Sequence, residues 1–595
     1  MKPNLFLVLF AFVYTGLSAQ IVLPDNMYAD SAHAPFLHGV ASGDPLTDKV
    51  IIWTRITPDS TENKVVTWEI ATDIAFTQSL QSGIFTTDST IDWTVKIDVA
   101  NLTQGTTYYY RFSDEQSNYS VIGRTKTAPS GNSSELKFAV VSCSSAYSGY
   151  FNAYRRIGER DDVNLVIHLG DYVYDFADAN EEVRIPIPYP ANPANLDEWR
   201  EREAYWLLDP DFRFVKQQHP FTIMWDNHDL ALSDVNIPTK AFLEWTPTRV
   251  LNQTDVKKIY RKLSYGGLAD IFILDVMLYR DIELISADEY SILGTEQYNW
   301  FLNELGASTA KWKIVGFQKM FSYWGAQGLD AIIPTEGGVF NVATWDGYML
   351  ERKNVLDFID ANNIDNVIMI SGDSHVSLAA DLTRDPTGSD GEYNPETGEG
   401  ALGVELLPTS VTRGNFDEQG LPDFLLNVLY TINAQNNPHQ VYVELTKHGY
   451  GLWNLGQDSA IGQIWYSDIL ASTTEEDLGK ELVVYNGANH YKRAGQQLPS
   501  AIKDILPAGH FISEPYPNPA ADEIKIDFSF PSNQNLDIEV YHVQLLRKLK
   551  LTQKTTTGIN QKQTIRFSTS DLAPGTYIIY LSGKEIQAAK VFVKQ

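Results

Sequence analysis

The sequence predicts an α/β protein flanked by two β-sandwich domains, and three observations support this prediction. In the middle of the chain, short apolar runs alternate with longer amphipathic segments, which is typical of buried strands covered by helices. Toward both ends, short segments alternate apolar and polar residues with a period of two and are separated by turn residues. The length of 595 residues also exceeds what one hydrophobic core serves, so we expect several domains.

The first twenty residues have the features of a secretory signal peptide. One Lys precedes an apolar run, and small residues follow it at a plausible cleavage point after Ala19, which gives a signal peptide over residues 1–19. The apolar run is shorter than the roughly 20 residues that a membrane-spanning helix needs. The sequence therefore predicts an exported protein with no transmembrane segment in its mature chain.

Three regions follow the signal peptide. Residues 36–130 form strand-like segments only and predict the first sandwich. Residues 135–490 contain the apolar runs of the α/β domain, and residues 495–513 are a polar linker. Residues 514–595 again alternate with a period of two, and they predict the second sandwich.

Charge and cysteine content narrow the possible functions. The net charge of −29 would repel a phosphate backbone, so we expect no stable nucleic-acid partner. The single cysteine, Cys143, excludes an intrachain disulfide. Its thiol is therefore packed in a core, reactive or bound to a metal.

Several central strands end in a potential metal ligand. The runs at 137–143, 164–171, 221–229 and 366–373 all finish on polar residues. These residues are Cys143, Asp171, Asn227, His228 and Asp373, and His375 follows two positions later. Any one of them could simply cap the next helix, but four such strand ends together favour a site at the carboxyl edge of the sheet.

The donor atoms suit a site with two metal ions. Asp171 can bridge two cations, Asn227 and Asp373 offer hard oxygen atoms, and His375 offers an imidazole. Tyr174 stands three residues after Asp171 and can ligate only a strongly acidic cation, which favours a ferric ion. Cys143 suits the same ion as a thiolate, although a buried structural cysteine is an equally simple interpretation.

Seven segments of the chain resemble the alkaline phosphatase D (PhoD-like) family, in the order in which that family has them. They are FLHGVASGDP with IIWTR (36–55), SCSSAYSGYFNAYRRI (142–157), HLGDYVYDF (168–176), HPFTIMWDNHDL (219–230), LGTEQYNWF (293–301), TWDGYMLER (344–352) and SGDSHVSLAADL (371–382). The resemblance implies a four-layer α/β/β/α metallophosphoesterase core behind an N-terminal sandwich, with Fe³⁺ and Ca²⁺ as cofactors.

The resemblance also assigns roles to the candidate residues. It implies that iron is bound by Cys143, Asp171, Tyr174 and His375, and calcium by Asp171, Asn227 and Asp373. In the wider superfamily a Gly-Asn-His-Asp/Glu motif supplies a histidine that protonates or stabilises the transferring phosphate. That motif corresponds to Asp226–Asp229 here, so His228 is the candidate catalytic residue and Asp229 the residue that orients its ring.

Two departures from the family pattern bear on the substrate. The family usually has an arginine where this chain has Met277, which could change specificity if that arginine contacts substrate. The family's Asp-Asp-His-Glu is Asp-Asn-His-Asp in this chain, which removes one negative charge from the site.

The C-terminal region resembles the sorting domain of the type IX secretion system. The segments that carry this resemblance are PYPNPAADEIKI (515–526), DLAPGTYIIYL (571–581) and KVFVK (590–594). An ordinary carbohydrate-binding or surface-binding sandwich is the alternative. The order of the motifs at the end of the chain favours sorting, and it implies the type IX machinery as a partner.

These observations predict a secreted metal-dependent phosphoesterase. We expect attack on phosphorus by a metal-bound hydroxide, with small-molecule phosphomonoesters or phosphodiesters as substrates. A phospholipase D-type phosphodiesterase is the enzymatic alternative, and a non-catalytic surface binding protein on the same scaffold is the other.

Overall fold

The structure is a computed structural model of the whole chain. It describes residues 27–595 except 132, 177–182, 185–192, 231–233, 253, 282–289, 328–338, 419, 422, 494–509, 514, 519, 532–534, 543–546, 556–560, 571, 574, 583–586 and 595. The expected signal peptide and most of the expected linker lie outside the described residues.

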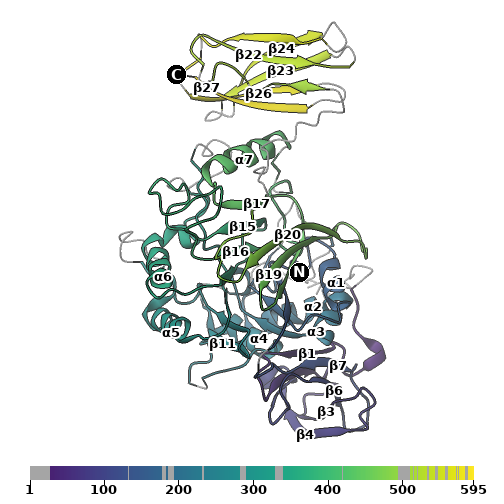
Figure 1. Ribbon diagram of the computed structural model, residues 1–595. Helices are drawn as coiled ribbons and strands as arrows, with labels where there is room; N and C mark the ends of the chain where they lie inside the picture. Colours follow the sequence, from purple (N-terminus) through teal and green to yellow (C-terminus); the bar gives the residue numbers. More distant parts are fainter. Residues whose placement is uncertain are drawn as a thin grey trace, which may run out of the picture.

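Two β-sheets form the centre of the molecule (Figure 1). The larger sheet has nine strands in the order β20 (Asp477–Tyr485), β19 (Ser459–Tyr466), β18 (Gly449–Leu455), β8 (Leu136–Val141), β9 (Leu165–His168), β10 (Pro220–Ile223), β1 (Val40–Gly43), β2 (Val50–Arg55) and β5 (Thr94–Val99). The second sheet has seven strands in the order β11 (Arg261–Tyr265), β12 (Ala269–Ile273), β13 (Trp312–Gly316), β14 (Val367–Ile370), β16 (Val404–Leu407), β15 (Ser377–Asp381) and β17 (Gln440–Glu444).

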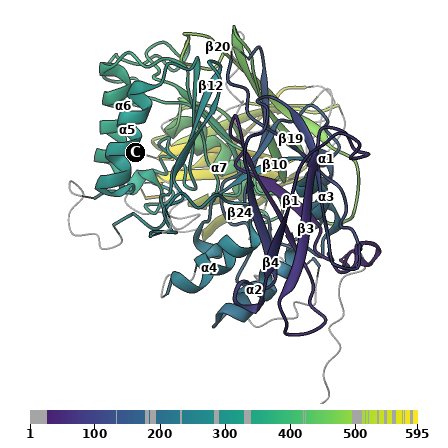
Figure 2. The same cartoon turned by 90° about the horizontal axis from the view of Figure 1, so that it is seen from below.

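Helices cover the outer faces of both sheets. On the nine-stranded sheet they are α1 (Asn152–Gly158), α2 (Leu196–Trp206), α3 (Pro210–Gln218) and α4 (Asn236–Trp245). On the seven-stranded sheet they are α5 (Gly294–Ala307) and α6 (Met349–Ala361), which lie side by side on the opposite flank in Figure 2. A further helix, α7 (Asp423–Asn436), packs near β17.

The alternation of side chains along the strands fixes these layers. Ile314 and Ile368 face the other sheet, where they join Val140 and Ile167 in the main core. The next residue, Val315, faces the other way and packs with α5 and α6. The four-layer α/β/β/α prediction is confirmed.

The N-terminal sandwich shares a sheet with the catalytic region. Strands β1, β2 and β5 belong to the nine-stranded sheet, because β1 pairs in parallel with β10 at Ser42 and Pro220. The second layer is a four-stranded sheet, ordered β4 (Ser79–Thr87), β3 (Lys64–Ala71), β6 (Thr107–Ser113) and β7 (Gly123–Lys126). No break in hydrogen bonding therefore separates this sandwich from the core.

The C-terminal sandwich has two sheets of its own. One contains β21 (Phe511–Ile512), β22 (Glu523–Ser529) and β25 (Gln563–Ser568). The other contains β24 (Arg547–Thr555), β23 (Asn535–His542), β26 (Gly575–Ser582) and β27 (Gln587–Lys594). They enclose a separate apolar core and lie beyond α7 in Figure 1. Among the described residues, no helix is both long enough and apolar enough to cross a membrane.

Candidate metal centre

The expected ligands meet where strands of both sheets end. Cys143 follows β8 and Asp171 follows β9, while Asn227 opens the short 3₁₀ helix η3 (Asn227–Asp229) after β10. Asp373 and His375 follow β14 of the second sheet. The centre therefore lies at one edge of the central sheets, as the strand ends predicted.

Four of the expected ligands have an unusual backbone conformation. The φ angles of Cys143, Asp171, Asp373 and His375 are 57°, 51°, 68° and 54°, in the left-handed region. Such a conformation costs a non-glycine residue about 1–3 kcal/mol and concentrates at functional sites. The fold holds these side chains in place against a local backbone preference.

A first group of donors combines sulfur, oxygen and nitrogen. Ligand atoms of Cys143, Asp171 and His375 all lie within 4.8 Å of one another. The Tyr174 hydroxyl donates to Asp171 Oδ2 at 3.1 Å, and Cys143 Sγ lies 3.8 Å from the same oxygen. His375 Nδ1 donates to the Gly414 carbonyl at 3.1 Å, which leaves Nε2 as the nitrogen free to bind a metal.

The electrostatics of this group disfavour negative charge unless a cation is bound. Burial, and next the charge of Asp171, raise the pKa of the Cys143 thiol and of the Tyr174 phenol. Burial lowers the pKa of His375 to about 3, so its imidazole is neutral and able to ligate. Thiolate and phenolate forms therefore require a bound cation of high charge.

A second group consists of three carboxylates and a lysine. Oxygen atoms of Asp171, Asp226 and Asp373 lie within 4.8 Å of one another. Lys319, which follows β13, places its Nζ 2.9 Å from Asp226 Oδ1 and 3.0 Å from Asn227 Oδ1, and it also pairs with Asp373 Oδ1. Burial, opposed by Lys319 and reinforced by Asp171 and Asp373, raises the pKa of Asp226 to about 8.

Sequence reasoning missed Asp226 and Lys319. Asp226 stands at the same strand end as Asn227, so its position was a usable signal. Lys319 had no such signal, because a lysine after an apolar strand is usually a solvent-exposed residue.

The catalytic candidate His228 has a different partner from the expected one. Its Nδ1 is 2.7 Å from Asp175 Oδ1, and its backbone N–H donates to Asp171 Oδ1 at 3.0 Å. Burial opposes protonation of His228, but the charges of Asp171 and Asp175 outweigh it and raise the pKa of the imidazole. His228 is therefore suited to carry a proton.

The expectation that Asp229 orients the His228 ring was wrong. Its carboxylate accepts hydrogen bonds from the backbone N–H groups of Tyr172, Val173 and Asp226 at 2.8–3.1 Å. Asp229 thus fixes the two loops that carry the ligands. Asp229 adjoins His228 in the sequence, which favours a contact between the two side chains, but the turn of η3 directs the Asp229 carboxylate to backbone N–H groups instead.

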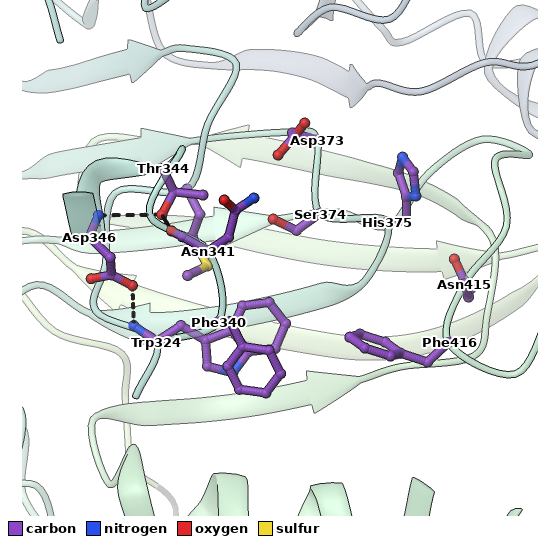
Figure 3. Close-up of a pocket in the computed structure, with 11 residues that line it drawn as sticks. Trp324, Phe340, Asn341, Thr344, Asp346, Asp373, Ser374, His375, Asn415 and Phe416 are labelled. Atoms are coloured by element: carbon purple, nitrogen blue, oxygen red, sulfur yellow. Dashed lines mark hydrogen bonds between the residues drawn. The ribbon is translucent and has the colours of Figure 1, made fainter. Parts of the chain in front are cut away.

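A pocket of about 270 Å³ opens beside the centre (Figure 3). Asp373, Ser374 and His375 line one side of it. The rings of Trp324 and Phe340 stack at 4.0 Å on the opposite side, near Phe416. The pocket therefore joins the metal ligands to an aromatic wall.

Met277 does not face this pocket. Its side chain is 2% exposed and belongs to the main core, while its backbone N–H donates to Asp275 Oδ1 at 2.8 Å. In this chain, position 277 therefore contributes to the packing of the core.

Four layers with a metal-ligand cluster at the strand ends define the class of metal-dependent phosphoesterases, and the comparisons with known proteins agree. The family model of the PhoD-like phosphatases matches residues 138–231 and 235–463, and the model of their N-terminal domain matches residues 23–129. The chain is 31% identical over 450 residues to alkaline phosphatase D of Bacillus subtilis (strain 168), covering 67% of this chain and 74% of that protein.

A solved structure described as "Structure of PhoD" superimposes with a TM-score of 0.68 and 25% identity, over 79% of this chain and 94% of that one. The chain belongs to the PhoD-like phosphatase family. The homology to alkaline phosphatase D places the chain among the phosphoester hydrolases, and the family is metal-dependent.

The C-terminal sandwich matches the secretion system C-terminal sorting domain over residues 514–595. This confirms the predicted sorting domain and indicates export by the type IX system to the cell surface or beyond.

Proposed function

We propose that the protein is an exported phosphoesterase that hydrolyses small phosphomonoesters, phosphodiesters or both at the centre around Asp171. The observation that carries the proposal is the convergence of Cys143, Asp171, Tyr174 and His375, three of them in the left-handed conformation. A sulfur, carboxylate, phenol and imidazole set with raised thiol and phenol pKa values is suited to a ferric ion. We therefore propose Fe³⁺ at this group.

The second expected ion, Ca²⁺, fits less well. Asp171, Asn227 and Asp373 supply the hard oxygen atoms that calcium prefers, and Asp226 adds a buried Oδ2 that has no hydrogen-bond partner among the described residues. However, the Lys319 ammonium already contacts oxygen atoms of Asp226, Asn227 and Asp373. The proposed hydrolysis therefore does not involve calcium.

The residues have distinct roles in hydrolysis. A metal ion at Asp171, when bound, activates water and neutralises the phosphoryl oxygens. The raised pKa favours the doubly protonated His228 ring, in which Nδ1–H faces Asp175 and Nε2 carries a second proton. Nε2 can donate that proton to the leaving-group oxygen as the phosphorus–oxygen bond breaks, which leaves the ring neutral. Asp175 keeps the ring oriented.

The pocket in Figure 3 suggests where the organic part of the substrate lies. Its polar side carries Asp373 and His375, and its aromatic side carries Trp324, Phe340 and Phe416. An aryl or other flat apolar group on the phosphate would stack on these rings. A lipid-sized diester, which the phospholipase alternative requires, would extend beyond 270 Å³.

A substrate panel with metal analysis tests the proposal. Full-length wild type should contain iron and hydrolyse an aryl phosphomonoester, a bis-aryl diester or both, faster than phosphatidylcholine. Asp171→Asn should lose turnover, while the exposed control Asp390→Asn should retain it. Metal-free, inactive wild type would instead support the non-catalytic binding protein, and preferred turnover of phosphatidylcholine would support the phospholipase.

A further inference from the structure

Lys319 stands at the position where a second cation is expected. Its side chain is 5% exposed, and its ammonium contacts oxygen atoms from two chain segments, Asp226 with Asn227 after β10, and Asp373 after β14. Asn227 and Asp373 are two of the three residues expected to bind calcium. The ammonium therefore lies among the oxygens of the expected calcium site.

The contacts of this ammonium leave little room for a competing ion. A lysine ammonium has three N–H donors, and three oxygen partners from Asp226, Asn227 and Asp373 match that number. Calcium requires six to eight oxygen ligands at about 2.3–2.6 Å. A calcium ion on the same oxygens would lie close to a fixed positive charge, and the two would repel each other strongly.

The two donor groups are therefore neutralised in different ways. In the first group, the Cys143 thiol and the Tyr174 hydroxyl both face Asp171 Oδ2, and a thiolate or phenolate at this place would need a bound cation. In the second group, the chain itself supplies a positive charge between Asp226 and Asp373. A lysine is charged at neutral pH and needs no loading from the medium.

We infer that the Lys319 ammonium replaces the second metal ion, so that the centre binds one metal, at Cys143, Asp171, Tyr174 and His375. Lys319 is a positioning residue, since it holds Asp373 at the edge of the pocket and offsets the carboxylate charge next to the phosphate site. The role near phosphate rests on the proposed function, whereas the number of metal ions does not.

Metal counting on the full-length holoprotein tests this inference. After equilibration with about 1 mM CaCl₂, the upper end of the Kd range of extracellular calcium sites, and removal of free ions, wild type should retain one transition-metal ion and less than about a tenth of an equivalent of calcium. Lys319→Met removes the charge at similar length and should gain one calcium equivalent, visible in elemental analysis and in a calcium titration by calorimetry. Lys319→Arg should keep calcium out.

Lys313→Met is the matched control. Lys313 lies on β13, and its ammonium contacts the Asp365 carbonyl away from the centre. This variant should bind metal as wild type does. Stoichiometric, tightly held calcium in the wild type would overturn the inference, even if Lys319→Met fails to fold. A Lys319→Met variant that folds and gains no calcium site would also overturn it.

The same experiment separates this inference from the proposed function. One metal in wild type and two in Lys319→Met, with no hydrolysis by either, would leave the inference standing and overturn the phosphoesterase. Hydrolysis by a wild type that holds calcium would do the reverse.

Discussion

The two halves of the metal centre share Asp171 but differ in how their charge is balanced. In the half around Cys143 and Tyr174, burial raises the pKa of the thiol and of the phenol, so these groups would ligate as anions only beside a strongly acidic ion. The half around Asp226 and Asp373 already contains Lys319. The difference teaches that a carboxylate cluster does not by itself indicate how many metal ions a site holds.

Removing the residue that both halves share should have the largest effect. Asp171→Asn keeps the shape of the side chain but weakens ligation in both groups, and it replaces one of the two oxygens that accept from the Tyr174 hydroxyl and the His228 N–H by an NH₂ donor. We expect kcat/KM to fall by roughly four orders of magnitude and the iron content to drop below a tenth of an equivalent. Steady-state kinetics and elemental analysis measure both, and an iron-loaded, active variant would refute the shared role.

His228 is proposed to act as a general acid and is a member of neither ligand group. We expect His228→Gln to lower kcat by about a hundredfold to ten-thousandfold, the range for loss of a general acid, while the metal content stays unchanged. The loss should shrink for aryl esters whose leaving group needs no proton. An equal loss for good and poor leaving groups would contradict the general-acid role.

Tyr174 allows the half of the centre around Cys143 to be tested by visible absorption spectroscopy. If a phenolate binds Fe³⁺ there, the protein absorbs in the visible range, and Tyr174→Phe should abolish this band while lowering kcat/KM by about 10–100-fold. Tyr147→Phe is a control, because Tyr147 is a buried tyrosine in the same core. A band that persists in Tyr174→Phe would show that Tyr174 is not a ligand.

Substitution of Asp175 should have the smallest effect on kcat, and the effect should appear mainly in the pH dependence of kcat. Its charge raises the pKa of His228 against the opposing effect of burial, so Asp175→Asn should lower that pKa. The acid form is then lost at lower pH, and the alkaline limb of the kcat profile should move to lower pH. The loss of kcat at the optimum should be about tenfold or less. An unmoved limb would mean that Asp175 does not act through His228.

Much of this centre was predictable because strand ends are encoded locally. Apolar runs that finish on Cys143, Asp171, Asn227 and Asp373 marked the edge of the sheet where the ligands meet. The same runs predicted an α/β layer structure, and the family resemblance implied that it has four layers. These signals depend on residues that are adjacent in the sequence.

The remaining features depend on contacts between distant segments. The pairing of Lys319 with Asp226 and Asp373 joins three strand ends from two sheets, which no local pattern specifies. The choice of Asp175 over Asp229 as the partner of His228 depends on the turn of η3. The insertion of β1 beside β10 merged the first sandwich with the core, although its alternating strands resembled an independent domain.

The position of β8 has a consequence for how the protein matures. This strand precedes Cys143 and lies between β9 and β18, with Val140 paired to Gly451. The nine-stranded sheet therefore closes only after almost the entire catalytic region has been synthesised, and pairing between such distant segments is slow. A chain that stays incomplete for so long is well suited to export before it folds, and a metal ion at Asp171 would bind only where the last strands assemble.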